Sequence, residues 1–350
     1  MQTNQRSADM ILVTGGSGYI GSVAVRELLN NGFAVRVVDK FLFGDDGLEE
    51  VKNRIECIQG DLCKFDSAWL EDVEGVVHLA GLSNDPMAEF NPEANRRLNT
   101  EATAILGEHC KRRKINRFIF ASSCSIYDRG LLAEDILQDE ESPVEPRAAY
   151  AVSKYQAERE LLKLAGPDFC PTILRQGTVY GWSPRMRYDL VVNTFVKSAF
   201  EKGVLIVHCG GEMWRPLIDV NDIAHAYIAC LQADMKSVAN QIFNLSYKNY
   251  RILELAHWVR KVFREKGIDV DIQVEYGSTK GRSYRVDTRK IEREIGFRPQ
   301  ISVEEAVQTM VDKIQNGIHA DFNNPRYYNI QWVELLCTAE NIIKKTGSIL

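Results

Sequence analysis

The feature that most constrains the fold of this chain is a group of glycines that interrupts an apolar segment near the N-terminus. Residues 10–14 form a mainly apolar run, glycines follow at positions 15, 16, 18 and 21, and apolar residues return from position 23. This pattern predicts a buried strand, a tight turn and a helix, in which the glycines let the backbone approach a pyrophosphate at the helix N-terminus. The residues expected around that pyrophosphate are Gly15, Gly18, Tyr19, Ile20 and Gly21.

An acidic residue at the end of the next apolar run narrows the choice of dinucleotide. The run covers residues 34–38 and ends in Asp39, which stands 18 residues after Gly21. A carboxylate at this place accepts hydrogen bonds from an adenosine ribose and repels a 2′-phosphate. The ammonium of Lys40 offsets part of that repulsion. The sequence therefore predicts a site that binds NAD in preference to NADP.

The composition is that of an ordinary globular protein and excludes several classes of partner. The 350 residues are 45% hydrophobic and 26% charged, and the formal net charge of −5 argues against a nucleic-acid or anionic-membrane surface. No apolar stretch approaches the roughly 18 residues that cross a bilayer, and the polar residues 1–9 lack a signal-peptide core, so we expect a cytoplasmic protein. The eight cysteines form no C-x-x-C pair and the six histidines form no cluster, so we expect no metal site.

Apolar runs alternate with helical patterns through the first half of the chain. The runs cover residues 10–14, 34–38, 55–58, 76–80, 117–121 and 171–174. This rhythm predicts an α/β fold with a Rossmann-type, doubly wound parallel sheet. We expect an NAD-binding domain over residues 1–177, to which residues 216–250 could return, and a smaller mixed α/β substrate lobe over residues 178–350. Helices are expected at 94–112, 153–164, 188–202, 221–233, 252–266 and 303–316.

A tyrosine and a lysine at the start of a predicted helix indicate acid–base chemistry. Tyr150 and Lys154 are four residues apart and therefore lie on one face of the helix. A nearby ammonium favours the phenolate, which makes the tyrosine a usable base. The apolar run that ends at residue 121 leads directly into Ser122 and Ser123, and ligands of an open α/β sheet bind beyond the carboxyl ends of its strands. We expect these hydroxyls to meet a substrate oxygen.

With these residues the sequence resembles the extended short-chain dehydrogenase/reductases that act on nucleotide sugars, whose best-known members are the UDP-galactose 4-epimerases. The resemblance covers nearly the whole chain. It rests on the glycine turn, Asp39, Gly60-Asp61-Leu62, His78-Leu79-Ala80-Gly81, Asn99, Ser122-Ser123, Tyr150 with Lys154, and Leu174-Arg175 through Val179-Tyr180-Gly181. It implies NAD as cofactor, a nucleotide-diphosphate sugar as substrate and a homodimer.

The resemblance also implies a role for each matching residue. For the cofactor, Asp61 and Leu62 flank the adenine. Leu79, Ala80 and Gly81 lie along the pyrophosphate and ribose, and Asn99 lies beneath the pocket. Lys154 holds the nicotinamide ribose. Ser122 and Tyr150 are also among the cofactor-binding residues. For the substrate, Ser123 hydrogen-bonds the sugar oxygen and Tyr150 removes its proton. Arg215 and Arg282 grip the diphosphate through charge-assisted hydrogen bonds, and Asn193, Thr178 and Ser83 complete the substrate site.

Departures from the family pattern bear on the reaction. Nucleotide-sugar 4,6-dehydratases carry an Asp-Glu pair where this chain has Cys124 and Ser125, which argues against 4,6-dehydration. Cys124 is interpreted as a small buried thiol rather than a proton-transfer group. Asp128 and the loop over residues 183–189 also differ from the epimerase pattern. The expected activity is epimerisation through a transient 4-keto sugar. A one-way 4-ketoreductase or 4-dehydrogenase, and a non-catalytic NAD-binding sensor, remain as alternatives.

Overall fold

The centre of the molecule is a seven-stranded sheet in which every neighbouring pair of strands is parallel. The computed structural model describes residues 8–128, 136–277 and 282–348. The sheet order is β11-β7-β5-β4-β1-β2-β3, and its strands are β1 (Met10–Thr14), β2 (Ala34–Asp39), β3 (Glu56–Gln59), β4 (Val73–His78), β5 (Arg117–Ser123), β7 (Cys170–Gln176) and β11 (Ile242–Leu245). Chain order reverses between β1 and β4, which is the switch point where ligands bind in doubly wound sheets. The predicted fold class is confirmed.

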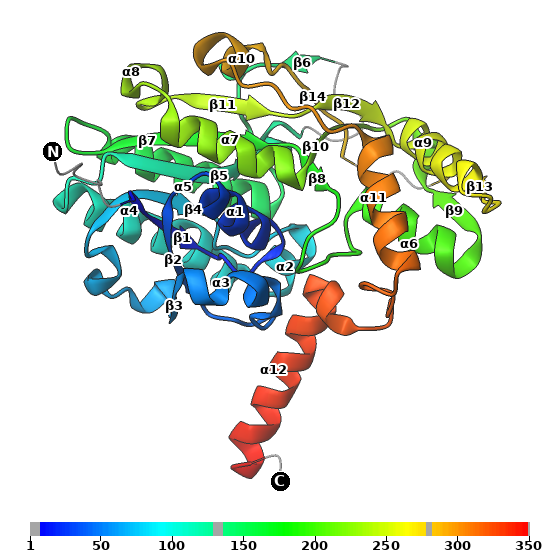
Figure 1. Ribbon diagram of the computed structural model, residues 1–350, viewed down its shortest axis with the longest axis horizontal. Coiled ribbons are helices and arrows are strands. Elements are labelled where there is room, and N and C mark those ends of the chain that lie inside the picture. Colours follow the sequence, from blue (N-terminus) through cyan, green and yellow to red (C-terminus); the bar gives the residue numbers. More distant parts are fainter. Residues whose placement is uncertain (1–7, 129–135, 278–281, 349–350) are drawn as a thin grey trace, which may run out of the picture.

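Both faces of the central strands are buried, which explains why these strands appear in the sequence as continuous apolar runs, whereas the edge strand β3 is largely exposed. Ile11 and Val13 pack on one face, while Leu12 packs on the other. The first face is covered by α1 (Tyr19–Asn30) and α7 (Val220–Gln232), which pack against each other (Figure 1). The second is covered by α4 (Ala102–Arg112) and α5 (Ala149–Leu164). Shorter helices α2 (Asp85–Phe90) and α3 (Pro92–Arg96) also contact α5.

The remaining elements form a second layer around small sheets. β8 (Thr178–Tyr180), β10 (Trp214–Asp219) and β12 (Lys248–Arg251) make one sheet. β9 (Val204–Val207) pairs with β13 (Asp271–Val274), and β6 (Leu137–Gln138) pairs with β14 (Arg285–Val286). The helices here are α6 (Val191–Lys202), α8 (Met235–Val238), α9 (Ile252–Glu265), α10 (Arg289–Ile295) and α11 (Val303–Gln315). The chain re-enters the large sheet through α7 and β11, and the core under α1 continues beneath α6, α9 and α11.

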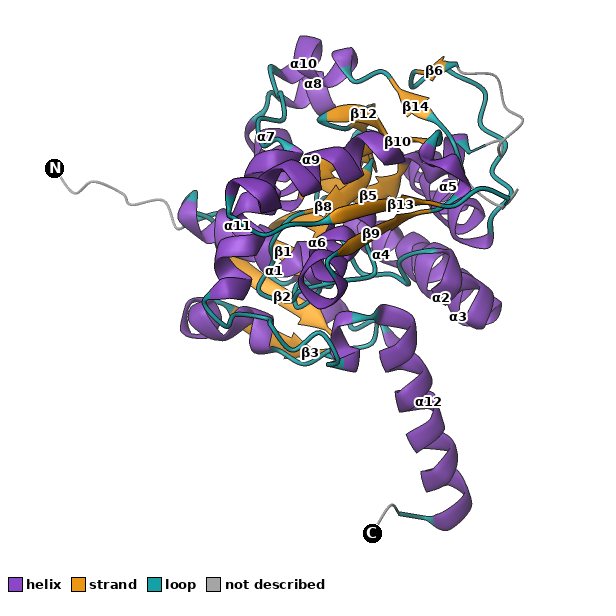
Figure 2. Ribbon diagram, turned by 90° about the vertical axis from the view of Figure 1, so that its right-hand side faces the viewer, coloured by secondary structure: helices purple, strands orange, loops and turns teal. Residues whose placement is uncertain are grey.

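The last helix, α12 (Asn329–Thr346), points away from the body of the protein (Figures 1 and 2). Asn329, at its first turn, is the one residue of this helix that is fully buried. None of the helices in the described parts of the chain combines the length and apolar character that crossing a bilayer requires.

A buried histidine at the end of β4 links the sheet to α4. The ring of His78 is 2.6 Å from Thr14 Oγ1 through Nδ1 and 2.8 Å from Thr103 Oγ1 through Nε2. Burial, together with the positive charge of Lys154, lowers the pKa of His78 to about 3. The imidazole is therefore neutral in the folded protein over the physiological range.

This neutral histidine predicts a specific loss of stability in acid. Because the unfolded chain takes up a proton near pH 6.5 and the folded one near pH 3, stability falls as the pH drops below about 6.5. We expect His78 to account for about 2 kcal/mol of unfolding free energy lost between pH 7 and pH 5. Urea unfolding of wild type and of His78→Asn at both pH values tests this, and equal losses in the two proteins would contradict it.

Candidate active site

The glycine turn between β1 and α1 has the close backbone packing that only glycine permits. Gly15 has φ +74°, and a Cβ added there would lie 2.7 Å from the Ala80 nitrogen. A Cβ on Gly21 would overlap the carbonyl of Gly15. Gly18 is the N-cap of α1 and provides no side-chain cap. The first amides of α1, from Tyr19 to Gly21, lack helical acceptors by geometry and therefore fit an anionic pyrophosphate.

The residues predicted to hold the adenosine come together at the ends of β2 and β3. The Asp39 carboxylate accepts hydrogen bonds from the amides of Ser17, at 3.0 Å, and Phe41, at 2.8 Å, and so is fixed beside the glycine turn. Lys40 forms an ion pair with Asp61 at 3.1 Å. Leu62 follows Asp61 and is buried. This geometry fits NAD: an acidic side chain next to an uncapped helix N-terminus.

Asn99 lies beneath the segment that follows β4 and supports it. Its Oδ1 accepts from the Leu82 amide at 2.8 Å and its Nδ2 donates to the Leu82 carbonyl at 3.0 Å. A Cβ on Gly81 would lie 2.7 Å from Asn99 Oδ1, so Gly81 is needed for this contact. Asn99 belongs to a single wide turn, residues 97–101, that joins α3 to α4, and such turns are frequent at functional sites. The position of Asn99 beneath a cofactor pocket stays a prediction.

The tyrosine, lysine and serine of the predicted relay lie where β5 ends and α5 begins. Ser123, the last residue of β5, lies close enough to Tyr150 to lower the pKa of the phenol, while its hydroxyl donates to Ser125 Oγ at 2.9 Å. Lys154, one turn further along α5, is buried and donates to the Ala121 carbonyl at 2.9 Å. Burial lowers the pKa of Lys154 to about 8. The three side chains therefore occupy the carboxyl edge of the sheet, as the sequence predicted.

The electrostatic surroundings of Tyr150 are mixed in sign. Burial raises the pKa of Tyr150 to about 12, against the opposing effects of the Arg187 charge, the Ser123 hydrogen bond and the Arg282 charge. Asp85 acts in the same direction as burial. The phenol is thus protonated in the free protein, and the cations around it are the groups that favour the phenolate.

The side chains of two predicted site residues, Ser122 and Asn193, form hydrogen bonds with other parts of the protein. The Ser122 hydroxyl hydrogen-bonds Glu158, two turns beyond Tyr150 on α5, and its place in the cofactor site stays a prediction. Asn193 is fully buried in α6; its amide accepts from the Gly181 nitrogen at 3.1 Å and donates to the Arg187 carbonyl at 2.9 Å. These bonds hold the loop after β8, and the place of Asn193 in the substrate site stays a prediction.

The predicted substrate arginines lie together near Tyr284. Arg215, on β10, is half-buried with its guanidinium 5.6 Å from the Tyr284 ring centroid. Arg282 forms an ion pair with Asp85 at 2.9 Å. Burial lowers the pKa of Arg215, and the charge of Arg282 adds to that effect. Two neighbouring cations of this kind favour an anion between them. Thr178, on β8, pairs with Leu217 of the strand that carries Arg215.

Sequence reasoning missed the polar network that surrounds Ser83. The Ser83 hydroxyl accepts from Arg187 at 3.2 Å and from Asn329 Nδ2 at 2.8 Å. Arg187 also forms a two-point ion pair with Asp189, at 2.8 and 3.0 Å. Arg187 and Asp189 lie in the unusual 183–189 loop, and that loop was the sequence signal for these two members of the network. Asn329 carried none, since it joins the site from a helix 246 residues further along the chain.

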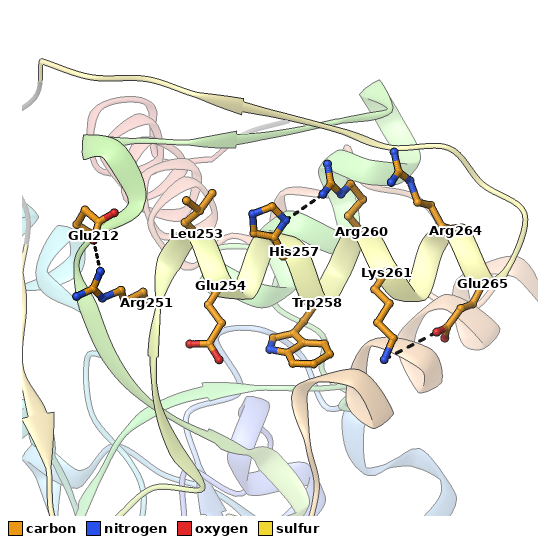
Figure 3. A pocket seen from close by; sticks show the side chains of 10 residues that line it. All are labelled: Glu212, Arg251, Leu253, Glu254, His257, Trp258, Arg260, Lys261, Arg264 and Glu265. Atoms are coloured by element: carbon orange, nitrogen blue, oxygen red, sulfur yellow. Dashed lines mark hydrogen bonds and ion pairs between the residues drawn. The ribbon is translucent and has the colours of Figure 1, made fainter.

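A surface pocket of about 820 Å³ lies away from this chemistry, along α9 (Figure 3). It is lined by charged side chains that pair with one another, such as Arg251 with Glu212 and Lys261 with Glu265. Its members are separate from Ser123, Tyr150 and the glycine turn. We therefore place the active site at the carboxyl edge of the large sheet and not in this pocket.

Comparison with known proteins identifies the class. A profile of the NAD dependent epimerase/dehydratase family matches residues 11–246. The chain is 27% identical over 320 residues to a "Putative UDP-glucose 4-epimerase" of Methanocaldococcus jannaschii, covering 88% of this chain and 99% of that protein. It is 28% identical over 325 residues to a dTDP-glucose 4,6-dehydratase of Streptomyces niveus, covering 86% and 91%. The structure of MoeE5 in complex with UDP-glucuronic acid and NAD matches with a TM-score of 0.76 at 25% identity, covering 89% and 100%.

The fold and the site together define an NAD-dependent enzyme of the extended short-chain dehydrogenase/reductase type. The glycine turn, Asp39 and the group of Ser123, Tyr150 and Lys154 stay the predicted cofactor-binding and catalytic residues of this enzyme. The chain belongs to the NAD dependent epimerase/dehydratase family.

Proposed function

We propose that this enzyme is a nucleotide-sugar 4-epimerase that works through a transient 4-keto sugar. The observation that carries the proposal is that Ser123 and Tyr150 come together at the carboxyl end of β5, with Lys154 one turn along α5. The adjacent pair Cys124 and Ser125 supplies no carboxylic acid. Such a site supports reversible oxidation of a sugar hydroxyl and lacks, at those two positions, the acids that 4,6-dehydration uses.

Each residue has a distinct task in the proposed reaction. Tyr150 takes the proton of the C4 hydroxyl as the 4-keto sugar forms, and returns it when the carbonyl is reduced. Ser123 hydrogen-bonds the reacting oxygen and orients the phenol. Lys154 holds the nicotinamide ribose and keeps a positive charge near the phenol. When bound, NAD supplies the acceptor and the donor of the hydride.

The environment of Cys124 supports its interpretation as a structural thiol. It is fully buried and its Sγ lies 2.9 Å from the Arg175 carbonyl oxygen. Burial raises the pKa of the Cys124 thiol far above its usual range. A thiol held in this way does not serve as a proton-transfer group near neutral pH.

The redox balance of turnover tests the proposal. NAD-loaded enzyme is mixed with UDP-, dTDP-, GDP- and CDP-hexoses, and NADH absorbance and product stereochemistry are followed together. We expect a C4 epimer to form without added cofactor and without net change in free NADH. Continuous consumption or release of NADH would overturn the epimerase proposal in favour of a 4-ketoreductase or a 4-dehydrogenase. NAD binding without any turnover would favour a sensor.

Arg215 provides a test of the substrate end of the site. We expect Arg215→Ala to raise KM about 10- to 100-fold with kcat within about threefold, because a charge-assisted contact to the diphosphate is equal in ground and transition states. Arg251→Ala is a matched control. Like Arg215, Arg251 lies over an aromatic ring, that of Trp214 at 5.0 Å, but it pairs with the exposed Glu212. Steady-state kinetics decide, and loss of kcat at unchanged KM would place Arg215 among the catalytic groups.

A further inference from the structure

The segment Ser83-Asn84-Asp85, which follows β4, has a strained backbone. Asn84 has φ 99° and ψ 162°, a combination that glycine adopts and other residues rarely do. Its side chain accepts a hydrogen bond from the Met87 amide at 3.1 Å and so caps α2. Strain of this kind persists only where surrounding contacts impose it, and it concentrates at functional sites.

The contacts that impose this conformation come from both layers of the molecule. Ser83 is held by Arg187 and Asn329, as described above, and Asn84 Nδ2 lies 3.4 Å from Asp189 Oδ2. Asp85 pairs with Arg282 through Oδ2. These contacts fix three successive residues. They therefore also fix the position of the Asp85 side chain, the third of the three.

The carboxylate of Asp85 is only half satisfied. Oδ2 meets Arg282, while Oδ1 is buried and accepts no hydrogen bond from any described part of the chain. The side chain as a whole is 17% exposed. A buried acceptor without a donor is costly and uncommon in folded proteins, so a ligand that brings a donor would relieve that cost.

Asp85 lies beside the catalytic tyrosine. It opens α2, which packs against α5, the helix that begins with Ala149 and Tyr150. Just before it, a Cβ on Gly81 would lie 3.6 Å from Lys154 Nζ. The charges of Asp85 and Arg282 both act on the Tyr150 phenol. The unsatisfied oxygen is thus near the place where the sugar reacts.

Two of the cations around this place are paired with carboxylates of the protein. Arg187 is matched by Asp189, and Arg282 is matched by Asp85. Lys154 and Arg215 donate to the carbonyl oxygens of Ala121 and Trp214 and keep their positive charge for an anion of the substrate, such as its diphosphate. A second carboxylate next to Asp85 would add like-charge repulsion in a poorly hydrated site.

We propose that Asp85 is a sugar-recognition residue whose Oδ1 accepts a hydrogen bond from a hydroxyl of the sugar, and that the enzyme therefore takes neutral hexoses in preference to hexuronic acids. This inference rests on the proposed function only in taking a nucleotide sugar as substrate. It names the sugar class and the side chain that selects it.

The test is equilibrium binding of a matched pair of sugars to the NAD-loaded protein. Calorimetry is carried out with UDP, UDP-glucose and UDP-glucuronic acid, and with the dTDP series in parallel. We expect wild type to bind the hexose at least about tenfold more tightly than the hexuronate. In Asp85→Asn this ratio should fall at least about tenfold while the Kd for the nucleoside diphosphate alone stays within about threefold. Asp271→Asn, on the exposed edge of β13, is the control and should leave the ratio unchanged.

The outcomes separate this inference from the proposed function. Tighter binding of the hexuronate by wild type, or an unchanged ratio in Asp85→Asn, overturns the inference and leaves the epimerase proposal standing. Binding of neither sugar more tightly than the nucleoside diphosphate, in both base series, overturns both. Because the wild-type ratio is itself decisive, the test does not depend on the variant folding.

Discussion

Replacing Tyr150 with phenylalanine should lower kcat by about 10²–10⁴-fold, the usual contribution of a positioned proton-transfer group. The change removes the phenol oxygen that interacts with Ser123 at the end of β5 and leaves the ring in place. NAD binding should be nearly unchanged, because Lys154 keeps its bond to the Ala121 carbonyl. The measurement is single-turnover kinetics on NAD-loaded enzyme with the nucleotide hexose identified by the redox-balance experiment.

Ser123→Ala is the companion variant and should cost less than Tyr150→Phe, since a water can replace one hydrogen bond. A Tyr150→Phe enzyme that kept more than a tenth of wild-type turnover would show that another group is the base. Loss of NAD binding in Tyr150→Phe would instead indicate that the phenol holds the cofactor and that the kinetic effect is indirect.

The sheet and the relay could be predicted because their signals are local. Strands buried on both faces appear as apolar runs, and the expected runs at 34–38 and 117–121 correspond to β2 and β5. The glycine turn and the spacing of Tyr150 from Lys154 are set within one strand–helix unit. Close backbone packing at Gly15 and Gly21 requires glycine at both positions, which makes the turn recognisable from the sequence.

What the sequence could not reveal depends on side-chain direction and on contacts between distant segments. Nothing in the residue type of Ser122 or Asn193 indicates that each side chain turns into the protein. Asn329 reaches Ser83 from the start of α12, and Asp85 meets Arg282 from a separate layer. The edge strand β11 is as short as β3, four residues, and Asn244 interrupts its apolar residues, so it lacked the pattern of a buried strand.

The second large effect concerns the buried ion pair that fastens α5 to the sheet. Glu158 and Arg175 meet at 2.8 Å with side-chain exposures of 1% and 4%. We expect Glu158→Gln to lower the unfolding free energy by about 3–5 kcal/mol, because it leaves the Arg175 guanidinium buried without a counter-charge. Glu160→Gln is a matched control on the same helix; its partner Lys163 is exposed, and the cost should stay below about 1 kcal/mol. Urea unfolding at neutral pH measures both, and equal losses would contradict the prediction.

A double variant distinguishes an unpaired charge from lost packing. Glu158→Leu combined with Arg175→Met removes both charges, and it should recover most of the stability lost in Glu158→Gln, since apolar replacements of a buried pair are often neutral.

The same double variant should also affect the active site. Glu158 lies one turn beyond Lys154 and raises its pKa against the effect of burial. Removing the carboxylate should therefore lower the pKa of Lys154 further, so that less of this lysine is protonated at neutral pH. A double variant that is stable but slow would show that this ion pair tunes the relay as well as holding the fold.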